Sequence, residues 1–141
     1  MRPLLLIDDD AVTLSVLAGT LKAAGLDSLL ARSAEAGLSL SLRDQPCAII
    51  CDLHMPVANG LDFLRSLRQS QQANNVPVAI VTRDLFVDDE TISRVLELGG
   101  CFYQGVLWEE ELLGLVRDLV NRGIASTDER GGVRTGFRSS R

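Results

Sequence analysis

Short apolar runs alternate along the chain with stretches whose apolar residues recur every three or four positions. The runs at 4–8, 26–31, 47–52, 76–82 and 101–107 are short and rich in aliphatic side chains. A continuous apolar run of this length is typical of a strand that is buried on both faces. The pattern therefore predicts five strands at these places.

A helix is predicted after each of these strands. Asp10 and Ser33 suit the starts of the first two, because a short polar side chain can accept a hydrogen bond from a free backbone amide. Gly25 suits the end of the first helix. Five strand–helix units predict a parallel sheet covered on both faces, and right-handed crossovers favour a doubly wound three-layer sandwich. The predicted helices lie at 10–25, 33–44, 61–70, 88–100 and 108–123.

The length of 141 residues fits one domain, and an apolar fraction of 46% indicates a globular chain. This pattern covers residues 1–123, whereas 124–141 is rich in Gly, Ser and Arg and predicts a tail or the start of a linker. A net charge of −5 argues against direct binding to nucleic acid or to a membrane surface. Three cysteines without a paired spacing, and no apolar run near the roughly 20 residues that span a bilayer, indicate a cytoplasmic chain with free thiols.

Acidic and hydroxyl side chains stand at the carboxyl ends of three predicted strands: Asp8 and Asp9 at the first, Asp52 at the third, Thr82 at the fourth. Ligand sites of open parallel sheets lie outside these ends, so neighbouring strands would bring the side chains into one crevice. Three carboxylates need a cation, and hard oxygen ligands suit Mg²⁺. Asp52 is the best candidate nucleophile, because carboxylates form acyl phosphates. The alternative for 8–10 alone is a solvated helix start.

Three segments, in this order and spacing, resemble the receiver domain of bacterial two-component response regulators: LLLIDDD at 4–10, CAIICDLHMPVANGLDFLRSLR at 47–68, and VAIVT at 78–82. The resemblance covers about residues 3–121. It implies a flavodoxin-like sheet of five parallel strands in the order 2-1-3-4-5. It also implies a regulatory phosphoacceptor domain rather than an enzyme, phosphorylated by the phosphohistidine of a histidine kinase or phosphotransfer domain.

Carried over by position, the resemblance implies that Asp52 accepts the phosphoryl group. Asp8 and Asp9 would bind Mg²⁺ together with Asp52 and the backbone carbonyl of His54. Pro56 would shape the loop after the phosphoacceptor.

The resemblance also implies a switch. Thr82 would move toward the phosphate, and Tyr103 would follow it inward, although an ordinary strand aromatic is the alternative for Tyr103. Gly60 would shape the same loop as Pro56. An output domain or downstream protein would bind the surface of the fourth helix, fifth strand and fifth helix, where Trp108 is expected at the edge, either packed in the core or contacting a partner.

The chain departs from the family pattern after the fifth strand, where the family has Lys followed by Pro. Aligned on Tyr103, these two positions hold Val106 and Leu107, and residues 95–116 contain no Lys or Arg. Mg²⁺ would then be the main counter-charge to the carboxylates and the phosphoryl group, so slower phosphorylation or a weaker response is expected. The nucleophile, metal ligands and hydroxyl remain, which favours an altered switch over an inactive one.

Two residues near the expected site have two interpretations each. Arg83 either pairs with Asp84 or Asp88 at the surface, or it reaches over the site and supplies the missing positive charge. His54, the only histidine, is either an exposed loop residue or close enough to act on the phosphoryl group.

Two other functions compete with the phosphoacceptor. The main alternative is a pseudo-receiver, a protein-interaction module that signals without phosphorylation, which the missing Lys favours. A small aspartyl-phosphate phosphatase would use similar acids. It would also need a second acid–base carboxylate beside the nucleophile and a cap over the substrate, and the chain offers neither.

Overall fold

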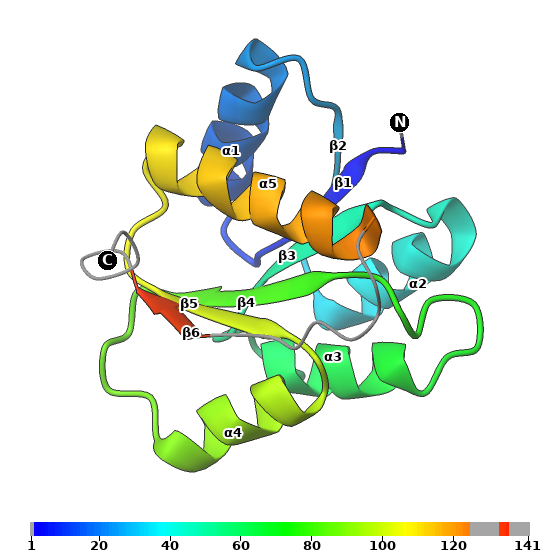
Figure 1. The fold of residues 1–141 in the computed structure, drawn as a ribbon, viewed down its shortest axis with the longest axis vertical. Coiled ribbons are helices and arrows are strands. Elements are labelled where there is room, and N and C mark those ends of the chain that lie inside the picture. Colours follow the sequence, from blue (N-terminus) through cyan, green and yellow to red (C-terminus); the bar gives the residue numbers. More distant parts are fainter. Residues whose placement is uncertain (1, 125–132, 136–141) are drawn as a thin grey trace.

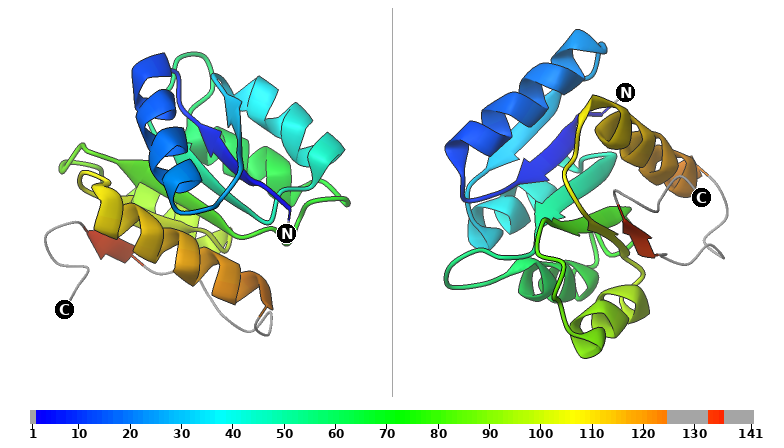
Figure 2. Two further views of the ribbon diagram at one scale, coloured as in Figure 1. Left: turned by 90° about the horizontal axis from the view of Figure 1, so that it is seen from above. Right: turned by 90° about the vertical axis from the view of Figure 1, so that its left-hand side faces the viewer.

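The computed structural model describes residues 2–124 and 133–135, and these form three layers (Figures 1 and 2). A parallel sheet lies in the middle. One face is covered by α1 (Ala11–Ala23) and α5 (Glu109–Ile124), and the other by α2 (Ala34–Asp44), α3 (Gly60–Arg68) and α4 (Asp89–Glu97). The predicted doubly wound sandwich is confirmed.

The five predicted strands are present and pair in parallel in the order β2-β1-β3-β4-β5. Because β1, β3 and β4 are neighbours, the polar residues at their carboxyl ends lie along one edge of the sheet. The strands are β1 (Leu4–Ile7), β2 (Ser28–Ala31), β3 (Ala48–Asp52), β4 (Val78–Thr82) and β5 (Cys101–Gln104).

Alternation along the strands explains the two buried cores. In β1, Leu5 and Ile7 pack on the side of α2, α3 and α4, whereas Leu4 and Leu6 pack on the side of α1 and α5. Each helix contributes one apolar face, as Leu112 of α5 does to the second core. Within the described part of the chain, no helix is long and apolar enough to cross a membrane.

Two predicted caps are observed. Asp10 accepts a hydrogen bond from Val12 N at the start of α1, and Ser33 accepts one from Ala36 N at the start of α2. Gly25 follows α1 at φ +84, a backbone angle that glycine adopts readily.

The predicted fifth strand at 101–107 is too long, because β5 ends at Gln104. Gly105 has φ +137, which turns the backbone out of the strand, and its amide donates to Thr82 O at 2.8 Å. Val106 and Leu107 therefore belong to the loop before α5, at the same edge of the sheet as Asp52.

The structure adds a sixth strand that the sequence pattern did not predict. Residues Val133–Thr135 form β6, which pairs in parallel with the outer edge of β5, from Phe102↔Val133 to Gln104↔Thr135. The prediction of a tail or linker otherwise falls on 125–132 and 136–141, outside the described residues.

Candidate functional site

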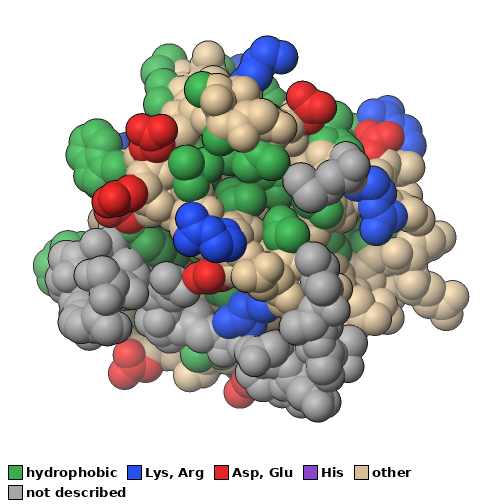
Figure 3. All heavy atoms as spheres, turned by 45° about the horizontal axis from the view of Figure 1, so that its top comes forward, with side chains coloured by type: hydrophobic (Ala, Val, Ile, Leu, Met, Phe, Trp, Pro, Cys, Tyr) green, Lys and Arg blue, Asp and Glu red, His purple; other side chains and the backbone are tan. Residues whose placement is uncertain are grey.

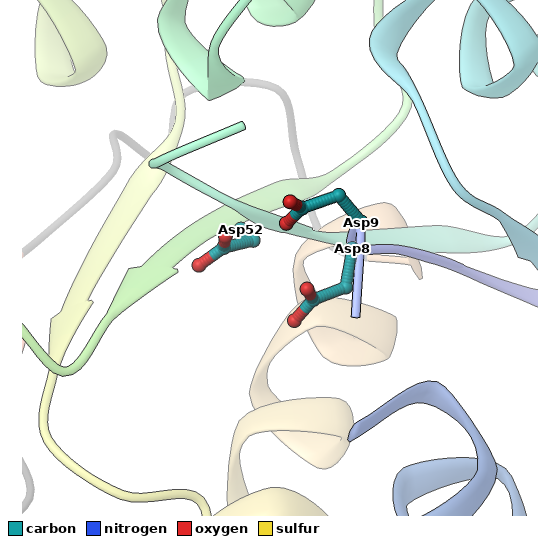
Figure 4. A group of neighbouring side chains, drawn as sticks. All are labelled: Asp8, Asp9 and Asp52. Atoms are coloured by element: carbon teal, nitrogen blue, oxygen red, sulfur yellow. The ribbon is translucent and has the colours of Figure 1, made fainter. Parts of the chain in front are cut away.

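Three carboxylates converge where β1 and β3 end. Asp8 and Asp9 follow β1, and Asp52 is the last residue of β3, which pairs beside β1 with Ile7 opposite Cys51. One oxygen from each carboxylate lies within 4.8 Å of the others, and all three side chains are half-buried. Figure 4 shows them pointing into a common space from two strands. The structure thus brings together the three side chains that were predicted from the sequence to bind a cation.

The surroundings of the carboxylates oppose full ionisation. Burial, followed by the neighbouring charges of Asp8 and Asp9, raises the pKa of Asp52 from 3.8 to about 7. Burial also raises the pKa of Asp8, although its carboxylate accepts a hydrogen bond from Asp10 N at 2.9 Å. A bound cation would offset both effects, so the electrostatics of the cluster favour a positive ligand.

Asp10, the third acid of the run, has a separate structural part. Its two carboxylate oxygens accept from Val12 N at 3.1 Å and from Thr13 Oγ1 at 2.7 Å. The bond from Thr13, followed by the one from Val12, lowers the pKa of Asp10. The solvated helix start considered for the whole run therefore applies to Asp10, while Asp8 and Asp9 face Asp52.

Thr82 ends β4 one residue beyond the pairing of Asp52 with Val81. Its side chain is buried, with 4% of the residue exposed, and its hydroxyl accepts a hydrogen bond from Asp84 N at 3.0 Å. Thr82 lines the cleft that contains the three carboxylates. It is therefore placed to exchange one hydrogen-bonding partner for another in the cleft.

The cleft has a volume of about 410 Å³, and its lining combines polar and apolar residues. The polar ones include the acids, Thr82 and Arg83. Apolar residues come from α1 and from the loop before α5: Val12, Val16, Leu17, Val106, Leu107 and Trp108. Figure 3, a view from the side of α1 and α5, shows hydrophobic side chains at the surface among charged ones. Trp108 is 69% exposed, so it is not a core residue.

Tyr103 lies inside the molecule. Only 1% of the residue is exposed, and its ring packs in the core between the sheet, α1 and α5. Its hydroxyl donates to Val106 O at 3.2 Å, which ties β5 to the loop before α5. Tyr103 pairs with Val81 in the sheet, and the next pair along the two strands is Thr82 with Gln104.

His54 is not among the residues that line the cleft, although it lies close enough for its charge to act on Asp52. Its Nε2 lies 3.0 Å from Asp84 Oδ2, and its side chain is 58% exposed. The structure therefore links the loop after β3 to the loop after β4 at the surface.

Asp84 joins the chain segments at the carboxyl ends of β3, β4 and β5, a role that the sequence pattern did not predict. Its amide donates to Thr82, its carboxylate accepts from Phe86 N at 2.9 Å and meets His54, and its carbonyl accepts from Gln104 Nε2 at 3.3 Å. The bond to Phe86, followed by the one to His54, lowers the pKa of Asp84. An Asp side chain that accepts from a backbone amide two residues later is a turn signal that the sequence can show. Contacts with partners distant in sequence leave no such signal.

The replacement His54→Ala tests whether the imidazole acts on chemistry in the cleft. If Asp52 accepts a phosphoryl group, as the resemblance implies, the rates of its phosphorylation and dephosphorylation should stay within about twofold of wild type, because the ring bonds to Asp84 at the surface. We expect the pKa of Asp84 to rise only part of the way to its ordinary value, since Phe86 N remains. Intact mass over time and NMR titration of Asp84 measure the two effects. A lifetime changed tenfold would place the imidazole at the phosphoryl group.

Comparison with known proteins agrees with this geometry. The family model for the response regulator receiver domain matches residues 4–103. The chain belongs to this family. Receiver domains are regulatory parts of two-component systems. These domains interact with histidine kinases or phosphotransfer proteins and bind Mg²⁺ at an acidic pocket.

The transcriptional regulatory protein CpxR of Klebsiella pneumoniae is 33% identical to this receiver domain over 133 residues, which cover 92% of this chain and 54% of CpxR. CpxR of Escherichia coli K12 is 32% identical over the same length, with the same coverage. The chain thus spans about half the length of these relatives. The polar-differentiation response regulator DivK of Brucella ovis is 24% identical over 100 residues, which cover 71% of this chain and 79% of DivK.

Solved structures show the same fold. The chemotaxis protein CheY4 of Vibrio cholerae has a TM-score of 0.76 at 23% identity, covering 84% of this chain and 98% of CheY4. The receiver domain of the sensor histidine kinase PA1611 from Pseudomonas aeruginosa, solved with a magnesium ion coordinated in its active site cleft, has a TM-score of 0.75 at 21% identity. It covers 85% of this chain and 98% of that domain.

Proposed function

We propose that this receiver domain is a Mg²⁺-dependent phosphoacceptor, which takes a phosphoryl group onto Asp52 from a phosphohistidine of a histidine kinase or phosphotransfer domain. The observation that carries the proposal is the convergence of Asp8, Asp9 and Asp52 within 4.8 Å. The buried hydroxyl of Thr82 on the same cleft supports it. The magnesium ion in the cleft of the PA1611 receiver domain is a further support.

The donor set fits Mg²⁺. Three half-buried carboxylates offer hard oxygen ligands, and few carboxylates plus water satisfy the octahedral preference of this ion. Asp8, Asp9, Asp52 and the backbone carbonyl of His54 would hold it. When bound, the ion offsets the charge of the carboxylates and of the phosphoryl oxygens.

The chain's own residues then perform the transfer. A carboxylate oxygen of Asp52 forms a bond to phosphorus, while the bond from phosphorus to the donor imidazole nitrogen breaks and its electron pair stays with that nitrogen. Asp52 must be ionised to act, and its raised pKa in the metal-free chain makes this the step that a cation would assist.

The switch residues respond to the new group. Thr82 Oγ1 accepts from Asp84 N, and its O–H would donate to a phosphoryl oxygen once the side chain turns toward Asp52. That turn would release Asp84 and the loop that carries Phe86, which is 93% exposed. Tyr103 would respond because it directly precedes Gln104, which pairs with Thr82 in the sheet.

The proposed output surface is that of α4, β5 and α5, which an output domain or downstream protein would bind. β6 pairs with the outer edge of β5, so this surface includes a segment of the chain itself. We further propose a cytoplasmic location, which Cys47, Cys51 and Cys101 support because cysteines outside disulfides suit a reducing compartment.

A pseudo-receiver remains the second candidate, on one observation. Val106 and Leu107 put apolar side chains on the cleft at the positions where the family pattern has Lys and Pro. A cleft that binds a metal ion but no phosphoryl group would give an interaction module without phosphorylation.

Intact-mass measurement after incubation with acetyl phosphate and Mg²⁺ separates the two candidates. We expect one phosphate adduct on the wild-type chain, and no adduct on Asp52→Asn or in the presence of EDTA. Calorimetric titration of Mg²⁺ into the same samples shows whether the acids bind metal. Metal binding without any adduct, even at long times, would favour the pseudo-receiver.

A further inference from the structure

We infer that Arg83 supplies the positive charge that holds the phosphoryl group on Asp52, an inference that rests on the proposed function. Arg83 directly follows β4 and lines the same cleft as the three carboxylates. No other Lys or Arg is among the described residues that line this cleft. Its side chain is exposed, so it can reach a group that enters from solvent.

The charge balance of the cleft explains why a cation is needed. Four aspartates line it, at 8, 9, 10 and 52, against the single guanidinium of Arg83. A phosphoryl group carries a charge of about −1.5 to −2 near neutral pH and replaces the −1 of the Asp52 carboxylate, so the cleft becomes more negative by roughly 0.5 to 1 charge. A guanidinium donates two parallel hydrogen bonds to phosphate oxygens, which a compact ammonium group cannot match in geometry.

The charge of Arg83 acts on Asp10, whose carboxylate accepts hydrogen bonds from Val12 N and Thr13 Oγ1. Asp84 and Asp88, the two partners considered from sequence, are also bonded elsewhere. Asp84 meets His54 Nε2 at 3.0 Å and accepts from Phe86 N at 2.9 Å. Asp88 caps α4 by accepting from Thr91 N at 3.0 Å. None of the ion pairs among the described residues includes Arg83. The surface pairing with Asp84 or Asp88, considered from sequence, is therefore not observed.

The backbone around Arg83 links it to the switch. The hydrogen bond from Asp84 N to Thr82 Oγ1 closes a turn with Arg83 in the middle. When the Thr82 hydroxyl turns toward a phosphoryl oxygen, this bond is lost and the turn can move toward Asp52. Thr82 and Arg83 would then reach the phosphoryl group from adjacent positions of one strand end.

The test compares two ligands of opposite charge on Arg83→Ala, Arg83→Lys and a control variant. Arg94→Ala is the control, because Arg94 is also exposed but pairs with Glu90 on α4, outside the cleft. Calorimetry measures Mg²⁺ binding to the free protein, and beryllofluoride binding in saturating Mg²⁺ as a mimic of the phosphoryl group. Intact mass gives the lifetime of the phosphorylated Asp52.

We expect Arg83→Ala to bind Mg²⁺ about two- to threefold more tightly, because a repelling cation is removed, and beryllofluoride about three- to tenfold more weakly. Arg83→Lys should lie between Arg83→Ala and wild type, and Arg94→Ala should match wild type. Both shifts should shrink as salt rises, since the side chain is exposed. A change of opposite sign for the two ligands is a result that general damage to the fold would not produce.

Three results would overturn the inference. Equal beryllofluoride binding by wild type and Arg83→Ala would remove Arg83 from the site and leave the proposed function intact. A wild-type chain that binds Mg²⁺ but neither beryllofluoride nor a phosphoryl group would refute the proposed function and this inference together. Weaker binding of both ligands by Arg83→Ala would also count against the inference, since it would reflect a disturbed cleft.

Discussion

The metal-free Asp52→Asn variant is expected to be more stable than wild type at pH 8, by about 2 kcal/mol once water screening of the half-exposed carboxyl group is included. Burial and the charges of Asp8 and Asp9 raise the pKa of Asp52 from 3.8 to about 7. Protonated Asp52 is favoured in the folded state, so its contribution is fully present below pH 3.8 and is lost as pH rises through about 7. Asn carries no charge at any pH, so this position adds no pH dependence to the free energy of unfolding of the variant.

Urea unfolding in EDTA at several pH values measures this effect. The difference in free energy of unfolding between the variant and wild type should be near zero around pH 4, grow up to pH 7, and level off above it. Asp27→Asn, which removes an exposed carboxylate outside the cleft, is the matched control and should show no such growth. A variant that is less stable than wild type at pH 8 would mean that the carboxylates do not oppose one another.

Added Mg²⁺ should make wild type more stable than the Asp52→Asn variant. Wild type offers three carboxylates to the ion and the variant only two, so wild type gains more stability from the same concentration of metal. This reversal connects stability to the proposed function, because the charge that destabilises the metal-free protein is the one that would bind metal and accept the phosphoryl group. Similar stabilisation of both proteins would place the ion elsewhere.

Features that depend on neighbours in sequence could be predicted. Short apolar runs identified the strands, and Asp10 and Ser33 identified the starts of two helices, because a cap contacts an amide only two or three residues away. The meeting of Asp8 and Asp9 with Asp52 followed from the rule that parallel strands present their carboxyl ends together. That rule needed the strand order, which came from the resemblance to receiver domains.

Features that depend on distant partners could not be predicted. Asp84 meets His54 and Gln104, and neither partner is marked in the local sequence around it. β6 pairs with β5 through backbone groups, which every residue carries, so its three residues have no distinguishing pattern. The end of β5 at Gln104 depends on the backbone angle of Gly105, which an apolar run continuing to Leu107 conceals.

Replacement of Gly60 by Ala is expected to lower the free energy of unfolding by about 2 kcal/mol, the ordinary cost of overpacking at a rigid contact. Gly60 begins α3, and its amide donates to Leu53 O at 2.9 Å, which folds the loop after β3 back onto the strand end. A methyl group at this position would lie 2.6 Å from Asp52 O and 3.1 Å from Leu53 Cα. Both are backbone atoms, so no flexible side chain can give way.

The clash also displaces the phosphoacceptor, since the backbone oxygen that must move belongs to Asp52. We therefore expect the rate of adduct formation with acetyl phosphate to fall by tenfold or more, in line with about a hundredfold for a misplacement of 1 Å. Gly114→Ala in α5 is the matched control, because nothing lies within 4 Å of its added methyl group. It should stabilise the helix by about 0.5–1 kcal/mol and leave the rate unchanged. A Gly60→Ala variant as stable and as reactive as wild type would show that this loop adjusts freely, and that Gly60 does not fix the position of Asp52.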